Sequence, residues 1–196
     1  LGLYLTGHPV NRYMAELERL ASDRIARLAP NADRVQRAAG LVVGLRSVNS
    51  RRGRMAILTL DDGTARMEAV AFSDVYQRVQ RFLVKDQILI AEGVLGADEF
   101  SGGCSMTIED LYDMDAARAR FARGMVVQLD QEAACPQLLE QIRDVLAPYC
   151  HGPARLYFEY KREDATALLP CSDAWKLAPT DELLDRLRSI DEVGAV

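Results

Sequence analysis

The spacing of hydrophobic and polar positions changes several times along this chain of 196 residues. Residues 11–29 carry apolar side chains at helical intervals and predict an amphipathic helix. From residue 39 the pattern becomes β-rich, and short turns containing Asp, Gly and Arg interrupt it. The predicted elements of this region are strands at 39–49, 54–60 and 65–72, a helix at 73–86, and strands at 87–95 and 104–114.

Three strands, one helix and two strands, in that order, are typical of an OB-fold, a partly open five-stranded barrel. We therefore predict an OB-fold barrel over residues 39–114. Gly40 and Gly44, inside the first strand, indicate a bend or bulge there. Met67, Ala69 and Ala71 occupy alternate positions of the third strand and are predicted to share one face.

The remaining sequence predicts a second, smaller unit of mixed helices and strands. Its elements are predicted as strands at 124–130, 154–160, 165–169 and 174–177, and helices at 136–149 and 179–190. Thr180 is the predicted N-cap of the last helix. The fold class is thus β plus α/β: a helical connector (1–38), the five-stranded OB-fold barrel (39–114), a linker helix (115–123) and a small α+β C-terminal domain (124–196).

The predicted barrel indicates where a ligand would bind. OB-fold proteins that bind oligonucleotides use the face of the second and third strands and the loops after the first and fourth strands. Here the first of these loops is rich in arginine, and Phe100 lies at the tip of the second. Arginines follow phosphates, and an aromatic ring stacks on an unpaired base. The candidate DNA-binding residues are Arg46, Arg51, Arg52, Arg54, Arg66 and Phe100.

Charge leaves an alternative open. The chain has a formal net charge of −5, but residues 1–81 hold 13 Arg and eight acidic residues, a net of +5. Residues 82–113 carry a net of −6, which repels DNA and suits a basic protein partner. An exposed turn also takes charged residues without any ligand, and OB-folds bind oligosaccharides and proteins as well. The barrel is therefore either a nucleic-acid-binding module or a protein-docking module or spacer.

No catalytic motif is present: there is no GxSxG, P-loop or HExxH sequence. Asp61 and Asp62 share a glycine-containing turn and are interpreted as turn residues. The four cysteines are far apart, so we predict reduced thiols and neither a metal site nor a cofactor. No apolar run is long enough to span a membrane, and a cytoplasmic location is expected.

Several segments together resemble one family. The stretches LGLYLTGHPVNRY, GLVVGLRSVNSRRGRMAILTLDD, RMEAVAFSDVYQRVQ, LVKDQILIAEG and DEFSGG resemble the C-terminal region of the bacterial replicative DNA polymerase III alpha subunit. A weaker similarity continues through ARARFARGMVVQL and AWKLAPTDELLDRLR. The resemblance implies a nucleotidyltransferase parent protein whose catalytic residues lie upstream of this chain, with other replisome subunits as partners through the parent.

The resemblance also implies roles for the two units. It associates the OB-fold barrel with single-stranded template and the C-terminal domain with the tau subunit of the clamp loader. Candidate tau-binding residues on the last predicted helix are Leu184, Arg188 and Ile190, although the two apolar ones are equally candidates for the core. The family's clamp-binding peptide is not recognisable, so clamp binding is not assigned.

Overall fold

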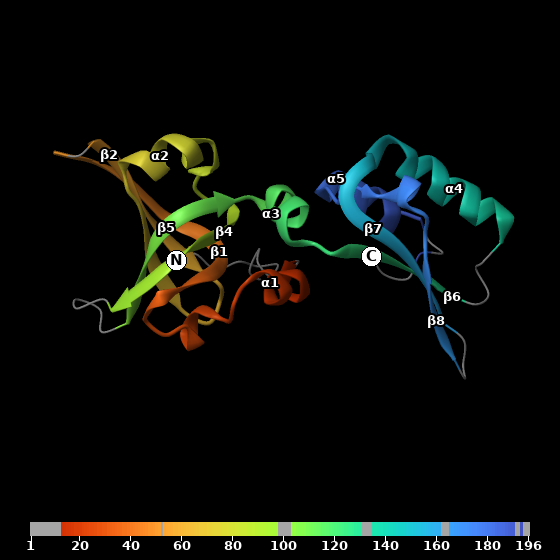
Figure 1. The fold of residues 1–196 in the computed structure, drawn as a ribbon, viewed down its shortest axis with the longest axis horizontal. Coiled ribbons are helices and arrows are strands. Elements are labelled where there is room, and N and C mark those ends of the chain that lie inside the picture. Colours follow the sequence, from red (N-terminus) through yellow and green to blue (C-terminus); the bar gives the residue numbers. More distant parts are fainter. Residues whose placement is uncertain are drawn as a thin grey trace, which may run out of the picture. The chain divides into compact units, whose positions relative to one another are not determined.

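The structure is a computed structural model that describes residues 13–51, 53–97, 103–130, 135–161, 165–190 and 193 (Figure 1). The chain divides into two compact units, Leu1–Asp113 and Met114–Val196. None of the helices in the described ranges is long and apolar enough to cross a membrane.

The first unit is a closed barrel with the strand order β1-β2-β3-β5-β4. Neighbouring strands are antiparallel except for β3 and β5, which are parallel. The strands are β1 (Asn31–Ser50), β2 (Gly53–Asp61), β3 (Arg66–Ala71), β4 (Ile88–Ala97) and β5 (Cys104–Tyr112), with the helices α2 (Ser73–Val79) and η3 (Gln80–Phe82) between β3 and β4. This arrangement confirms the predicted OB-fold.

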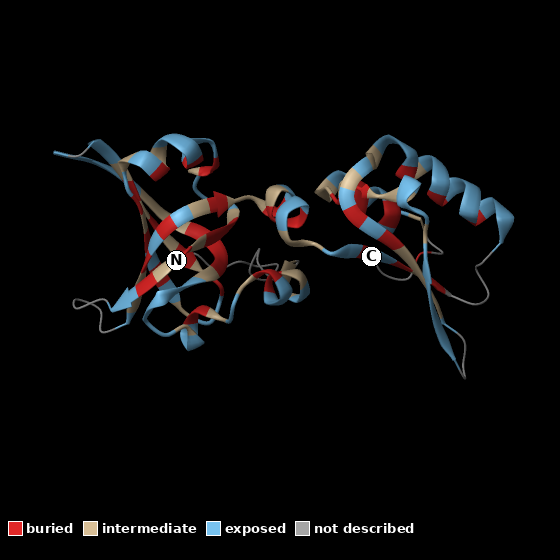
Figure 2. Ribbon diagram, in the orientation of Figure 1, coloured by how far each residue is buried: buried red, intermediate tan, exposed pale blue. Residues whose placement is uncertain are grey.

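Buried positions lie along the strands of the barrel (Figure 2), and their apolar side chains form its core. Met67, Ala69 and Ala71 are all buried, as predicted for one face of β3. The register of β1 against β2 shifts between Val42 and Gly44, which confirms the predicted irregularity in this strand.

The structure corrects two predictions in the first unit. The first strand begins at Asn31, well before residue 39, and the added part pairs with β4. Its first five residues are all exposed, so no alternation of hydrophobic and polar residues marks them in the sequence. The helix predicted at 11–29 is interrupted in the described part: α1 (Met14–Leu20) ends, and a separate 3₁₀ turn, η2 (Ile25–Arg27), follows.

The second unit packs helices on a three-stranded sheet. The sheet has the order β6-β7-β8, with β6 parallel to β7 and β8 antiparallel to β7. Leucine and isoleucine side chains of α4 and α5 form one core with the inward positions of β6. The elements are α3 (Met114–Phe121), β6 (Gly124–Asp130), α4 (Pro136–Leu146), η4 (Ala147–Tyr149), β7 (Cys150–Lys161), β8 (Thr166–Pro170), η5 (Asp173–Trp175) and α5 (Asp181–Arg188).

Two details of this unit bear on the predictions. Thr180 caps α5 as expected, because its Oγ1 accepts a hydrogen bond from the Leu183 N–H at 3.2 Å. The strand predicted at 174–177 is wrong, since η5 occupies its first half. Leu177 makes only isolated bridges, to Cys150 and Ala154, and its side chain is buried in the core.

Candidate functional site

The turn between β1 and β2 presents the arginine cluster. Gly53 has a φ of +110°, a backbone conformation that favours glycine, and its carbonyl oxygen accepts a hydrogen bond from the Ser50 hydroxyl at 2.9 Å. Arg51 is exposed at this turn. The Arg54 guanidinium lies over the ring of Tyr76 from α2, 5.5 Å from its centroid. Arg52 lies outside the described residues.

Two further candidates lie on the outer face of the barrel, each beside an acidic residue. Arg46 Nη2 is 3.0 Å from Glu68 Oε1, and Arg66 Nε is 2.8 Å from Asp61 Oδ2. Both arginine side chains are largely exposed, at 63% and 70%. The outer face therefore carries positive charge that carboxylates partly offset, which sequence reasoning did not anticipate.

Between these pairs the outer face is aliphatic. Strand β2 buries Ala56, Leu58 and Leu60, so Ile57 and Thr59 point outward. Ile57 pairs with Arg46 on β1 and with Val70 on β3. These side chains offer apolar contact but no ring for stacking, and Phe100, the predicted stacking residue, lies outside the described residues.

The outer face leads into a groove of about 860 Å³, which we call the β2–β3 groove. One wall is the chain segment that follows η2, and its floor is formed by polar residues of β2 and β3. Leu28, Ala29 and Pro30 lie on the wall, and Thr59, Arg66 and Glu68 lie on the floor.

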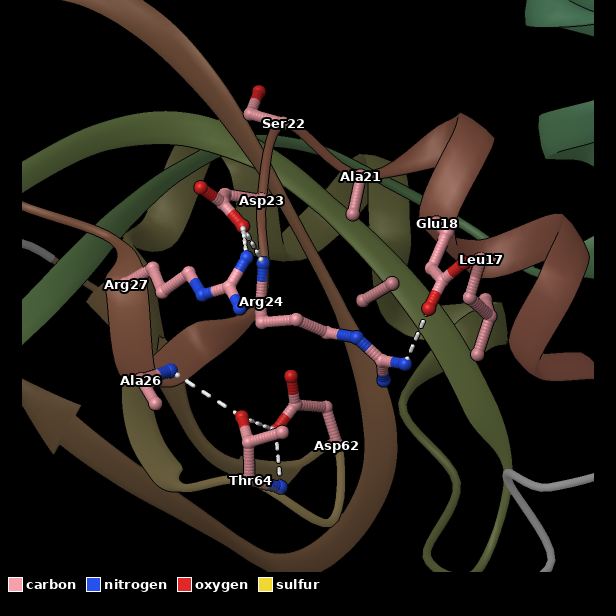
Figure 3. A pocket seen from close by; sticks show the side chains of 11 residues that line it. Leu17, Glu18, Ala21, Ser22, Asp23, Arg24, Ala26, Arg27, Asp62 and Thr64 are labelled. Atoms are coloured by element: carbon pink, nitrogen blue, oxygen red, sulfur yellow. Dashed lines mark hydrogen bonds and ion pairs between the residues drawn. The ribbon is translucent and has the colours of Figure 1, made fainter.

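Asp62 fixes this wall to the barrel. Its Oδ2 accepts a hydrogen bond from the Ile25 N–H at 2.9 Å, and its Oδ1 accepts from the N–H and hydroxyl of Thr64 at 2.9 and 2.6 Å. Figure 3 shows Asp62 and Thr64 at the neighbouring pocket, with Thr64 also accepting from the Ala26 N–H. Asp62 thus links η2 to the turn between β2 and β3.

The protonation of Asp62 reflects this environment. Burial alone would raise the pKa of the Asp62 carboxyl, but hydrogen bonds donated by Thr64, Ile25 and Ala65 outweigh burial and lower it below 3.8. The turn assignment for Asp61 and Asp62 fits this geometry, because Asp61 Oδ1 also accepts the Gly63 N–H at 2.9 Å. The contact from Asp62 to Ile25 was missed, and only the Asp-Gly-Thr turn sequence hinted at a carboxylate held in place.

The residues predicted to contact tau occupy different environments. Leu184 is buried in the core of the second unit, and Ile190 packs against that core. Of the two alternatives given for these apolar residues, the structure places them in the core, because the leucines at 183, 184 and 187 face inward from α5. Arg188 is exposed on the helix, 3.5 Å from Asp185.

No described residues form a group that could hold a metal ion: no three His, Cys, Asp or Glu side chains of these parts of the chain come together. All four cysteines are unpaired thiols. Burial raises the pKa of Cys104 and of Cys171, which keeps these two thiols protonated at neutral pH.

The fold and the outer face define the class of protein. Residues 37–114 match the family described as "OB-fold nucleic acid binding domain", which covers nearly the whole barrel. The first unit is thus an OB-fold domain. Residues 141–190 match the family described as "DNA polymerase III subunit alpha, C-terminal domain".

Whole-chain similarity is more specific. The chain is 41% identical to the DNA polymerase III subunit alpha of Escherichia coli strain K12, over 97% of this chain and 17% of the relative. It is 38% identical to the same subunit of Vibrio cholerae, with the same two shares. The chain belongs to the DNA polymerase III alpha subunit family and matches its C-terminal region. It spans about 17% of the length of the curated relatives it matches.

One solved structure is similar to part of this chain at a low level. A small single-stranded DNA-binding protein from Streptomyces coelicolor matches 43% of this chain and 95% of its own, with 13% identity and a TM-score of 0.36. A likeness at this level carries no argument about function.

Proposed function

We propose that this chain is a non-catalytic region of a bacterial replicative DNA polymerase alpha subunit, in which the barrel binds single-stranded template and the second unit binds the clamp-loader tau subunit. The observation that carries the DNA role is the placement of Arg46, Arg51, Arg54 and Arg66 on the β1–β2 turn and the outer face of an OB-fold barrel. The ligand is single-stranded DNA, without a cofactor.

The electrostatics support binding that depends strongly on salt. Exposed ion pairs such as Arg46–Glu68 contribute only about 0–1 kcal/mol, so a DNA phosphate competes with the carboxylate for the guanidinium. Each phosphate contact to a single strand contributes about −0.7 to the slope of log K against log salt concentration. A few such contacts give an affinity that falls steeply between low and physiological salt.

The test is fluorescence anisotropy of a labelled oligo-dT across a salt series. We expect the variant Arg51→Ala/Arg52→Ala/Arg54→Ala to bind more weakly and to lose about 2 units of slope, because three contacts are removed. The matched control removes three exposed arginines of the second unit. It is Arg143→Ala/Arg155→Ala/Arg186→Ala. Equal affinities of the wild type and the turn variant would refute a DNA role for this turn.

A protein-docking or spacer role is the second candidate. It is favoured by the pairing of Arg46 and Arg66 with carboxylates and by the aliphatic surface around Ile57. If this role is correct, the chain does not bind oligo-dT even at low salt, while it still binds tau. Measurable oligo-dT binding that the turn variant weakens would exclude it.

The tau role is supported by the family match of residues 141–190. Because Leu184 is buried, substituting it would disrupt the core, and deleting α5 would remove part of that core as well. Arg188 is the predicted contact that can be tested at the surface. We expect Arg188→Glu to weaken binding to purified tau about tenfold and the exposed control Arg155→Glu to leave it unchanged. Unchanged tau affinity of Arg188→Glu would contradict this contact.

The parent polymerase would supply the remaining partners. Contacts with other replisome subunits, and the cytoplasmic location that replication implies, belong to the proposal for the whole protein.

A further inference from the structure

The β2–β3 groove joins an apolar wall to a polar floor. Leu28, Ala29 and Pro30 present aliphatic surface on one side, and Thr59, Arg66 and Glu68 lie on the other. Its volume of about 860 Å³ is in the range of sites that hold small organic ligands, roughly 300–1,000 Å³. The groove therefore has the size and the mixed lining that an unpaired nucleotide requires.

The wall is attached to the barrel at two points. Before the wall, in η2, the Ile25 N–H donates a hydrogen bond to Asp62, and the Ile25 side chain is buried. Further along, the Cys104 thiol lies 3.7 Å from the Leu28 carbonyl oxygen and 3.8 Å from the sulfur of Met67 on the floor. Preorganised walls reduce the entropy cost of binding, so this groove can hold a ligand without first being ordered.

The floor continues the charged outer face. Arg66 uses its Nε to bind Asp61, and a guanidinium has further N–H donors on its two Nη atoms. Arg46 pairs with Glu68, which lines the same groove, so a strand that follows the arginines of the outer face reaches the groove directly. The guanidinium groups of Arg46 and Arg66 along this path offer N–H donors to phosphates, and Glu68 and Asp61 offset part of their charge.

We infer that the β2–β3 groove holds one unstacked base of single-stranded DNA, with Leu28–Pro30 against its face and Arg66 at its phosphate or its polar edge. This inference rests on the proposed DNA role of the barrel. The aliphatic wall takes the part that an aromatic ring plays in other single-strand binders, since none of the described residues that line the groove is aromatic.

The test separates base binding from phosphate binding. Anisotropy is measured with a labelled dT 15-mer and with an abasic 15-mer that keeps the phosphates but has no bases. We expect the wild type to bind the dT 15-mer about fivefold or more tightly than the abasic one, as expected for at least one base contact of about 1 kcal/mol. Ala29→Glu, which fills the groove, abolishes this preference.

The control places the same substitution outside the groove. Ala32→Glu, on the exposed first part of β1, adds the same charge and keeps the preference for the dT 15-mer. Equal affinity of the wild type for both oligonucleotides, or an unchanged preference in Ala29→Glu, would overturn the groove while leaving the phosphate-binding role intact. If neither oligonucleotide binds, the proposed DNA role fails and the groove inference with it.

Discussion

Asp62 is predicted to be the most important single residue for holding η2 on the barrel. Its side chain is only 5% exposed and accepts hydrogen bonds from Ile25, Thr64 and Ala65 at 2.6–3.1 Å. Removing a buried acceptor of this kind leaves donors unsatisfied, at about 1–3 kcal/mol for each buried group. The N–H groups of the turn reach water more easily than that of Ile25, so we expect Asp62→Ala to destabilise the barrel by about 2–4 kcal/mol.

Two substitutions sharpen this prediction. Asp62→Asn keeps one oxygen acceptor but turns an amide donor toward an N–H, so its cost should lie between that of Asp62→Ala and zero. Asp33→Ala removes an exposed carboxylate from β1 and should change the stability by less than about 0.5 kcal/mol. The order of destabilisation is expected to be Asp62→Ala, Asp62→Asn, Asp33→Ala.

Hydrogen exchange detects the effect locally. A loss of about 2 kcal/mol accelerates exchange about 30-fold, and it should do so first in peptides that contain Ile25 and Thr64. Trp175, the single tryptophan, lies in the second unit and provides an internal control by fluorescence in urea. The reasoning is wrong if Asp62→Ala behaves like Asp33→Ala, or if the Trp175 transition shifts as much as the barrel does.

The pH dependence of Asp62 has a defined sign. Its pKa is lower in the folded state than the ordinary 3.8, so its stabilisation is complete above 3.8 and is lost as the pH falls through the lower folded value. The stability difference between wild type and Asp62→Asn should therefore be constant from about pH 5 to 7 and shrink below about pH 4. A difference that grows on acidification would contradict the assigned hydrogen bonds.

Two further predictions concern the second unit, with Trp175 fluorescence in urea as the measurement. Arg118 is 2% exposed and lies 2.9 and 2.8 Å from the carboxylates of Asp115 and Asp181, so Arg118→Ala should cost about 1.5–3 kcal/mol by removing these charge-assisted contacts; an unchanged urea midpoint would contradict this. Thr180→Ala should cost about 1 kcal/mol because the cap of Leu183 is lost, whereas Thr180→Ser should retain most of it; equal effects of both would refute the capping role.

The sequence predicted strands well where hydrophobic and polar residues alternate, because that alternation reflects which side chains are buried. Strands β2 and β3 follow period-two patterns, and Met67, Ala69 and Ala71 are buried as that pattern requires. The order of strands and helix identified the fold because few architectures share it. The position of the arginine turn followed from the fold and from the short polar segment between two strands.

What the sequence did not reveal depends on contacts between distant residues. Asn31 to Val35 are all exposed and show no hydrophobic alternation. Only their pairing with β4 identifies them as part of a strand. The bond from Asp62 to Ile25 spans 37 residues, and no local pattern reports it. Arg46 meets Glu68 because the strand register places them on one face, 22 residues apart. Contacts of this kind can be identified only when the pairing register of the strands is known.

The paired arginines set the strength of the proposed DNA contact. A phosphate that binds Arg46 or Arg66 must share the guanidinium with Glu68 or Asp61, whose negative charge remains nearby. The gain at each of these positions is therefore smaller than for an arginine without an acidic neighbour. Most of the favourable charge must then come from the β1–β2 turn. If the barrel has the proposed DNA role, the contacts at Arg46 and Arg66 would therefore add little affinity compared with those of the turn.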